Sequence, residues 1–519
     1  MKKYIIILYA IIIPLLLIGQ DQKECASFEI FNKNLLSSSQ RREESQVFVS
    51  TITQSIRNII ARLSTPELHS DEYTIPVVFH VVQNNASVTV TPTEISNAID
   101  SLNQYYGKGS RYIRPPNRYS SVFKRETYVR FMLAKRNPTN KATNGINIVN
   151  VADQTLADVN ITSTRRGGVD PWDTKRYLNI WLTHEPHYID ATDPSCPGGR
   201  CPFLGMGTFP DITYPDSVTG VILDYKVIKN DASLGCKRIK VFAHEIGHFL
   251  GLRHIDGDGA SAPASDFVED TPLQNRHGST CPSPDDGTMY MNYMDYSCDA
   301  CRYMFTQGQV ARMLSTLNAG GRRSSLLTSN ALMLPNVTER NFLSEIGLEP
   351  QNRTRPSWEA SLIMLHGWAC QCSPAMDILM SNVRATYRGL PGLPENISQT
   401  ARALAITNYR ELLVSYPMRD FYSLLNNGPI TIIAVGTAGD SYGLVISGIR
   451  FDANGQGQLL ITDPMNIGPR GFNFQYTNDT SLVREGIGGS QYTVDYNRFF
   501  VDLISNALAN NKRIFLFSH

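Results

Sequence analysis

Three histidines at fixed spacing constrain this chain more than any other feature. His244 and His248 are four residues apart, so a helix places both imidazoles on one face, where they can bind one metal ion. Gly251 can adopt the positive φ that ends such a helix, and the turn then brings His254 to the same ion. Three neutral imidazoles leave the fourth position of a tetrahedral Zn²⁺ for water, which is typical of a catalytic site. The spacing therefore predicts a zinc site on a helix and the turn after it.

Glu245, next to the first histidine, supplies what hydrolysis needs. It can accept a proton from the metal-bound water, whose pKa zinc lowers to about 7, and pass that proton to a leaving amine. Surface histidines that meet by chance are the alternative. The third histidine and a downstream Met-turn, Asn292–Tyr296 around Met294, argue against chance, because together they are the pattern of the metzincins. The sequence therefore predicts a zinc peptidase.

Composition limits the partners. The chain has 519 residues and a net charge of +1, from 48 Lys and Arg against 47 Asp and Glu. This balance gives no electrostatic reason to expect binding to a nucleic acid or an anionic membrane, and the expected partners are protein or peptide substrates. A chain of this length predicts two to four domains.

The N-terminus predicts export. Lys2 and Lys3 precede an apolar run over 4–19, and polar residues follow, so residues 1–20 have the layout of a signal peptide. A membrane anchor is the alternative, but the run is shorter than the roughly 20 residues that a span needs. We expect a secreted, extracellular protein, or a periplasmic one, with no stable membrane span after cleavage.

Residues 21–71 are polar and are expected to form a pro-segment, with regular structure beginning in the strand pattern Tyr73–Val82. Apolar periodicity predicts helices from Thr93–Glu94 and over 238–250, and strands over 177–182 and 220–227. Thr306 and Gln309 form a capping-box pattern before another helix. A catalytic domain is expected over 72–320, a linker over 321–352 and a second domain over 353–519.

Several stretches of the catalytic domain resemble the pappalysins, a metzincin family: Thr74–Val82, Leu178–Trp181, Gly205–Pro210 and Phe305–Met313. The resemblance covers about residues 72–318. It implies an α+β metzincin domain, with a twisted mixed sheet and an active-site helix. It also implies zinc bound by the three histidines, Glu245 as general base and acid, and Met294 as a hydrophobic floor below the metal. Tyr296 matches the family tyrosine that stabilises the oxyanion, with a core tyrosine under the turn as the alternative.

The resemblance implies two further structural features. Asp266, Asp270 and Thr271 match a segment that binds structural calcium, with a solvated acidic loop as the alternative. Cys281 and Cys301 sit where the family has a disulfide. The partner of Cys298 stays open, Cys236 being one candidate, and Cys196 and Cys201 are expected to close a small loop.

Two residues carry predictions about regulation and specificity. Cys25 resembles the cysteine of pappalysin pro-segments, whose thiolate can occupy the open zinc position and keep a zymogen latent; a free or intermolecularly paired thiol is the alternative. Asp299 takes the place of an aspartate that favours arginine in the S1′ pocket of similar enzymes, which implies cleavage on the N-terminal side of Arg, and less readily of Lys. Its alternatives are capping a turn or facing solvent.

Residues 353–519 resemble papain-like cysteine peptidases of the bacterial avirulence-effector type, an α+β fold. Ser357 stands where that family has its cysteine and Tyr442 where it has its histidine, and only Asp463 remains. We therefore expect an inactive domain that binds a partner or supports the catalytic domain. A second hypothesis for the whole protein is a secreted binding protein with a structural zinc site, but such a site has no need of Glu245.

Overall fold

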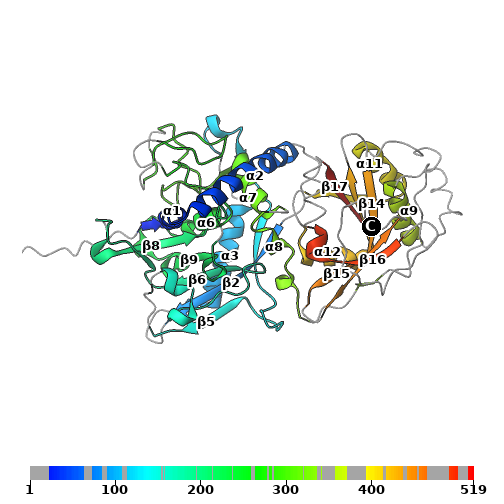
Figure 1. Ribbon diagram of the computed structural model, residues 1–519. Helices are drawn as coiled ribbons and strands as arrows, with labels where there is room; N and C mark the ends of the chain where they lie inside the picture. The colour runs from blue at the N-terminus through cyan, green and yellow to red at the C-terminus, as the bar shows by residue number, and fades with distance from the viewer. Residues whose placement is uncertain are drawn as a thin grey trace, which may run out of the picture.

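The computed structural model describes residues 23–335, 340–341, 357–370 and 393–518, apart from short internal gaps, of which the longest are 64–72, 84–89, 108–113, 465–489 and 501–511. The expected signal peptide lies outside these residues. Two separate sheets organise the described chain, one in each expected domain (Figure 1).

The first sheet is mixed and has the strand order β1-β8-β9-β6-β2-β4, with β5 also paired to β2 and β7 to β8. Its central strand, β2, pairs in parallel with three neighbours and is almost entirely buried, as its β-branched sequence predicts. The strands are β1 (Lys23–Cys25), β2 (Tyr73–Gln83), β4 (Val129–Leu133), β5 (Ile146–Asn150), β6 (Leu178–Thr183), β7 (His187–Ile189), β8 (Arg200–Gly207) and β9 (Val221–Asp224). A small ribbon pairs β3 (Phe123–Lys124) with β10 (Phe305–Thr306).

Three longer helices contribute to this core. The expected helix near Thr93 is α3 (Pro92–Tyr106), which buries Ile95, Ile99, Leu102 and Tyr106. The metal-motif helix is α6 (Lys240–Phe249). Helix α7 (Gln307–Leu317) begins at the expected capping box: the Thr306 hydroxyl accepts from the Gln309 amide, and the Gln309 side chain accepts from the Thr306 amide. Short helices are α4 (Asp158–Ile161), α5 (Tyr225–Ile228) and α8 (Ser324–Leu327).

The expectation that regular structure begins at Tyr73 is wrong. The expected pro-segment forms β1, which adds to the edge of the sheet beside β8, and then α1 (Ser27–Leu36) and α2 (Ser39–Leu63), which lie across the first domain (Figure 1). The helix α2 is polar on average, yet it buries Phe48, Ile52, Ile59 and Leu63, which share one helical face.

Two other boundaries differ from expectation. The strand expected over 220–227 ends at Asp224, because that side chain accepts the Lys226 amide and caps α5. Part of the expected linker is also structured. Leu326 and Leu327 of α8 join the first core, and β11 (Arg340–Asn341) pairs with β14 of the second sheet.

The second sheet has the order β12-β17-β13-β14-β15-β16 and is antiparallel throughout. Its strands are β12 (Asn408–Leu412), β13 (Ile430–Val435), β14 (Ser441–Phe451), β15 (Gly457–Asp463), β16 (Ser490–Asp495) and β17 (Arg513–Ser518), with helices α9 (Ser357–Cys370), α11 (Pro394–Ala403) and α12 (Met418–Leu424). Residues Trp358 and Leu362 of α9 pack with Ile433 and Phe515 of the sheet. The α+β class expected for both domains is confirmed.

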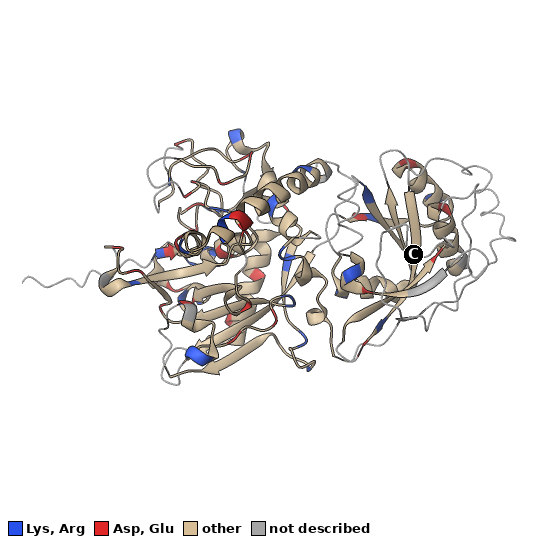
Figure 2. Ribbon diagram, in the orientation of Figure 1, with Lys and Arg blue, Asp and Glu red and all other residues tan. Residues whose placement is uncertain are grey.

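Charged residues of both signs are interspersed along both domains, as the balanced composition leads one to expect (Figure 2). Among the described helices, none has the length and apolar character needed to cross a bilayer.

Candidate metal centre and catalytic site

The three motif histidines converge as their spacing predicts. The Nε2 atoms of His244, His248 and His254 lie 3.1 Å from one another, and all three side chains are fully buried. Tetrahedral ligands at a zinc–nitrogen distance of about 2.0–2.1 Å are separated by roughly 3.3 Å. The three nitrogens therefore fit one zinc ion.

The opposite ring nitrogens fix the tautomers. The Nδ1 atoms of His244 and His248 lie 2.8 Å from the carbonyl oxygens of Tyr293 and Leu252, and Nδ1 of His254 contacts the Asp258 carboxylate. A carbonyl only accepts, so Nδ1 of His244 and of His248 must donate, which leaves the Nε2 lone pairs free for a metal. Burial also lowers the pKa of His244 and His248 well below the usual value, which keeps both rings neutral.

Two glycines allow close packing around helix α6: Gly251 in the turn that follows it, and Gly247 on the face that contacts Met294. Gly251, at φ +94°, turns the chain after α6, as expected. Met294 lies under the helix with its sulfur against Gly247, where a side chain of any size would collide with it. The Met-turn thus supports the helix that carries the first two histidines.

Glu245 faces the same centre and is fully buried. One carboxylate oxygen, Oε2, accepts from Ser27 Oγ at 2.7 Å and lies 3.6 Å from Cys25 Sγ. The other, Oε1, has no hydrogen-bond partner among the described residues. Burial raises the pKa of Glu245 to about 8, although the Ser27 and Cys25 contacts oppose the rise.

Cys25 lies at the centre too. Its sulfur and the three histidine nitrogens all lie within 4.8 Å of one another, and the thiol is buried and free. Strand β1 holds it there: β1 runs parallel to β8, with Cys25 opposite Gly205, and the Ala26 amide donates to the Gly205 carbonyl at 3.0 Å. The pro-segment thus covers the position opposite the three histidines.

Tyr296 stands on the far side of His254. Its hydroxyl is 2.9 Å from His254 Nε2, and the Arg276 guanidinium lies over its ring at 4.3 Å from the centroid. The hydroxyl is therefore beside the metal ligands rather than packed into the core, which is where a stabiliser of a developing oxyanion belongs.

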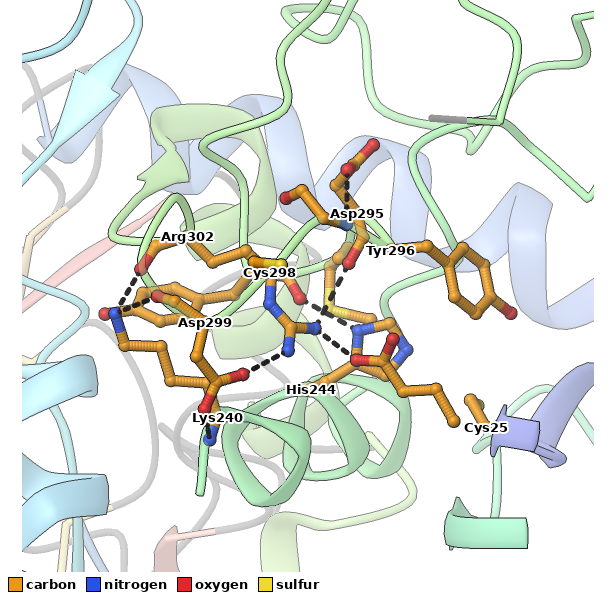
Figure 3. A network of polar contacts seen from close by, with 12 residues as sticks. Cys25, Lys240, His244, Asp295, Tyr296, Cys298, Asp299 and Arg302 are labelled. Carbon is orange, nitrogen blue, oxygen red and sulfur yellow. Dashed lines mark hydrogen bonds and ion pairs between the residues drawn. The ribbon is translucent and has the colours of Figure 1, made fainter. Parts of the chain in front are cut away.

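The Asp299 carboxylate forms a hydrogen bond and an ion pair with other residues of the domain. Its Oδ2 accepts the Lys240 amide at 3.0 Å, at the start of α6, and its Oδ1 pairs with Arg302 at 2.6 Å (Figure 3). Arg302 in turn pairs with Glu24 of the pro-segment at 2.6 Å. Asp299 therefore lies near the expected pocket, but it anchors the active-site helix and a buried arginine.

The sequence reasoning missed Glu24, Ser27 and Arg302. The position of each residue in the sequence could have indicated it: Glu24 and Ser27 lie on either side of Cys25, and Arg302 directly follows Cys301. A segment whose cysteine reaches the metal must place its neighbours in the cleft on either side.

The segment expected to bind calcium is held by internal hydrogen bonds. Asp266 accepts from the Thr271 hydroxyl at 2.7 Å and from the Val268 amide, while Asp270 accepts from Thr306 and Gly308 at the start of α7. Asp266 Oδ2 is buried without a hydrogen-bond partner among the described residues, and burial raises the Asp266 pKa to about 6.

Among the described residues, three disulfides link loops of the first domain. The structure joins Cys281 to Cys301 and Cys196 to Cys201, and it pairs Cys298 with Cys236. The last bridge ties the post-Met-turn segment to the loop before α6, and the Asp299 amide adds a hydrogen bond to the Cys236 carbonyl at 2.9 Å.

The C-terminal domain brings its three expected positions close together. The Tyr442 hydroxyl contacts the Asp463 carboxylate, and Ser357 Oγ accepts the amide of Gly443, the residue after Tyr442, at 3.1 Å. The papain-like layout is present, but a phenol stands where an imidazole base is needed.

Comparison with known proteins agrees with this arrangement. Residues 166–318 match the family model of peptidase M43, described as pregnancy-associated plasma protein-A, and residues 344–475 match that of peptidase C70, papain-like cysteine protease AvrRpt2. An extracellular metalloprotease of Arthroderma otae is 27% identical over 268 residues, covering 49% of this chain and 82% of that protein. One from Arthroderma benhamiae is 35% identical over 127 residues, covering 22% of this chain and 46% of that protein.

Solved structures of mirolysin from Tannerella forsythia are similar as well. Mature mirolysin in complex with a cleaved peptide is 32% identical, with a TM-score of 0.45, and the match covers 52% of this chain and all of that one. A promirolysin mutant is 29% identical, with a TM-score of 0.48, and the match covers 61% of this chain and all of that one.

Proposed function

Because this chain belongs to the peptidase M43 family of metallopeptidases, we propose that it is a secreted, zinc-dependent endopeptidase made as a latent precursor. One observation carries the proposal. Three buried imidazoles present their Nε2 lone pairs to one point, and the buried carboxylate of Glu245 lies beside that point with an unpartnered oxygen.

The chemistry follows from these positions. When bound, zinc lowers the pKa of a water ligand and polarises the scissile carbonyl. Glu245 takes the proton of the attacking water and delivers it to the leaving amine. Tyr296 turns its hydroxyl toward the developing oxyanion, while Nδ1 hydrogen bonds hold the histidine rings in place.

Latency rests on the pro-segment. Cys25 occupies the position opposite the histidines, as a thiolate ligand of zinc would, and Ser27 binds the carboxylate oxygen of the general base. The five residues Lys23–Ser27 thus cover the open position of the metal centre and occupy the proton acceptor, Glu245. We therefore expect activity only when this segment leaves the site, either by cleavage or by transient opening of the precursor.

Activity and its metal dependence can be tested together. The full-length protein is activated by limited trypsin digestion, trypsin is inhibited, and casein hydrolysis is followed with and without a zinc chelator. We expect loss of activity on chelation and in Glu245→Ala, with activity retained in Glu269→Ala, whose carboxylate is 87% exposed. Casein hydrolysis that survives both chelation and Glu245→Ala would overturn the proposal. Stoichiometric zinc without hydrolysis would instead favour the binding protein with a structural site.

Two accessory roles are proposed with it. The buried, unpartnered Asp266 Oδ2 supports a calcium ion bound by Asp266, Asp270 and Thr271, which metal analysis of wild type and Asp266→Asn would test. The C-terminal domain is proposed to bind a partner, since Ser357 and Tyr442 replace the nucleophile and the base. Cysteine-peptidase substrates hydrolysed by the Glu245→Ala protein would contradict that role.

Location and bond preference complete the proposal. Culture medium, rather than the periplasm, is where we expect the processed protein, and cell fractionation tests this. Cleavage before Arg or Lys would require an incoming cation to displace Arg302 from Asp299. The preferred residue therefore depends on all the charged groups around Asp299, and not on Asp299 alone.

A further inference from the structure

A buried arginine lies beside the three-histidine site. Arg302 has no exposed side-chain surface, and its guanidinium donates to Asp299 Oδ1 and to Glu24 Oε1, both at 2.6 Å, and to the Asp295 carbonyl at 3.2 Å. Its Nε has no hydrogen-bond partner among the described residues. Figure 3 shows Arg302 with Asp299 on one side and His244 on the other, and with Cys25 beyond His244.

Glu24 reaches this arginine from the cleft. It immediately precedes Cys25, whose sulfur lies at the metal centre, and its side chain is 1% exposed. The expected pro-segment thus places Cys25 at the metal centre and the neighbouring side chain of Glu24 against the chain just after the Met-turn. In a substrate, the side chain next to the scissile bond occupies that place.

The charge count of the pocket depends on the pro-segment. With Glu24 present, the cations Arg302 and Lys240 balance the carboxylates of Glu24 and Asp299. Without Glu24, the three remaining groups leave one uncompensated positive charge in a buried place, and an incoming arginine would raise it to two. An incoming carboxylate restores the balance and the hydrogen bond that Arg302 loses.

We propose that Arg302 determines specificity and selects an acidic side chain, Glu or Asp, in the S1′ pocket, so that the enzyme cleaves on the N-terminal side of acidic residues. This inference rests on the proposed peptidase function. Asp299 is then a positioning residue that orients the Arg302 guanidinium and caps α6, and Glu24 is the substrate-like occupant of the pocket in the precursor.

The test uses quenched fluorescent peptides that differ only at P1′, with Glu, Gln, Leu or Arg. The trypsin-activated full-length protein should cleave the Glu peptide roughly ten- to a hundred-fold more efficiently, in kcat/KM, than the Gln peptide, because a charge-assisted hydrogen bond is lost. Arg302→Gln should abolish this ratio, and Arg302→Lys should keep part of it. Arg118→Gln, which removes an exposed arginine, is the matched control and should leave it unchanged.

Each ratio is measured within one preparation, so partial misfolding of a variant does not change it. If Arg302→Gln does not fold, the precursor gives a second route. Glu24→Arg in the intact chain should raise the basal rate at least ten-fold, and Glu24→Gln should raise it less.

The outcomes separate the two levels of inference. Preferred cleavage before Arg or Lys would overturn the role of Arg302 and identify Asp299 as the reader of the pocket. Preferred cleavage before apolar residues would overturn a specificity role for Arg302 and for Asp299. Failure to cleave every peptide and casein would overturn the proposed function itself.

Discussion

Latency should depend on the Ser27 hydroxyl as well as on the Cys25 thiol. Ser27 is 1% exposed, and its Oγ donates to Glu245 Oε2 at 2.7 Å while accepting the Gly207 amide at 2.8 Å. Above pH 8, where the Glu245 carboxyl is ionised, the hydrogen bond to it contributes about 1.5–3 kcal/mol, and the neutral bond to the Gly207 amide about 1 kcal/mol. Ser27→Ala therefore removes about 2.5–4 kcal/mol of the free energy that holds the pro-segment in the cleft.

This loss of free energy should raise the activity of the uncut precursor. A tenfold change in an equilibrium corresponds to about 1.4 kcal/mol, so the small fraction of precursor with an open cleft should rise roughly 60- to 700-fold. Initial rates of the intact, trypsin-free precursor on a quenched peptide measure that fraction, and mass spectrometry verifies that the chain is uncut.

Ser50→Ala is the matched control, because Ser50 lies in α2 and its exposed hydroxyl donates only to the Val47 carbonyl. Its basal rate should equal that of the wild type. An uncut Ser27→Ala precursor that is as inactive as the wild type would refute the reasoning, since the contact with the general base would then contribute nothing to latency.

Three further predictions follow from the same contacts. Cys25→Ala should also raise the basal rate of the uncut precursor, because it removes the sulfur from the position opposite the histidines; an unchanged rate would leave Cys25 as a merely buried thiol. Gly247→Ala should destabilise the catalytic domain by about 1–3 kcal/mol, measured by denaturant unfolding, because the added methyl group collides with Met294, and Met294→Ala in the same chain should restore part of the loss. Zinc removal should lower the melting temperature of the wild type more than that of His248→Ala, measured by calorimetry, because only the wild type keeps all three histidine ligands; equal shifts would place the metal elsewhere.

The local chemistry of the site was predictable from the sequence because the residues involved act over short spans. Four-residue spacing places His244 and His248 on one helical face whatever the rest of the chain does, and Gly251 and the Thr306 capping box act within one turn. The end of β9 was not predictable from apolar character, because the Asp224 cap overrides the propensity of the residues after it.

The pro-segment shows a different limit. Averaged over its length, α2 is polar, and an average hides the face formed by Phe48, Ile52, Ile59 and Leu63. That face gains its stability only from the surface it covers, so nothing in the segment alone marks it as a packed element.

The predicted preference for Arg or Lys rests on one acidic residue, whereas the electrostatics around that residue depends on several groups. Asp299 was expected to bind a cation, and it does, but the cation is Arg302, three residues further along the same chain. The net charge that a substrate meets is the sum over every group around the pocket, including Lys240 from the start of α6 and Glu24 from a segment more than two hundred residues away. A pro-segment that fills the cleft must satisfy the buried polar groups that a substrate would otherwise satisfy, because an unpaired buried charge is costly. The residues of the segment therefore indicate which side chains the site accepts, and the residue that pairs with Arg302 is the acidic Glu24.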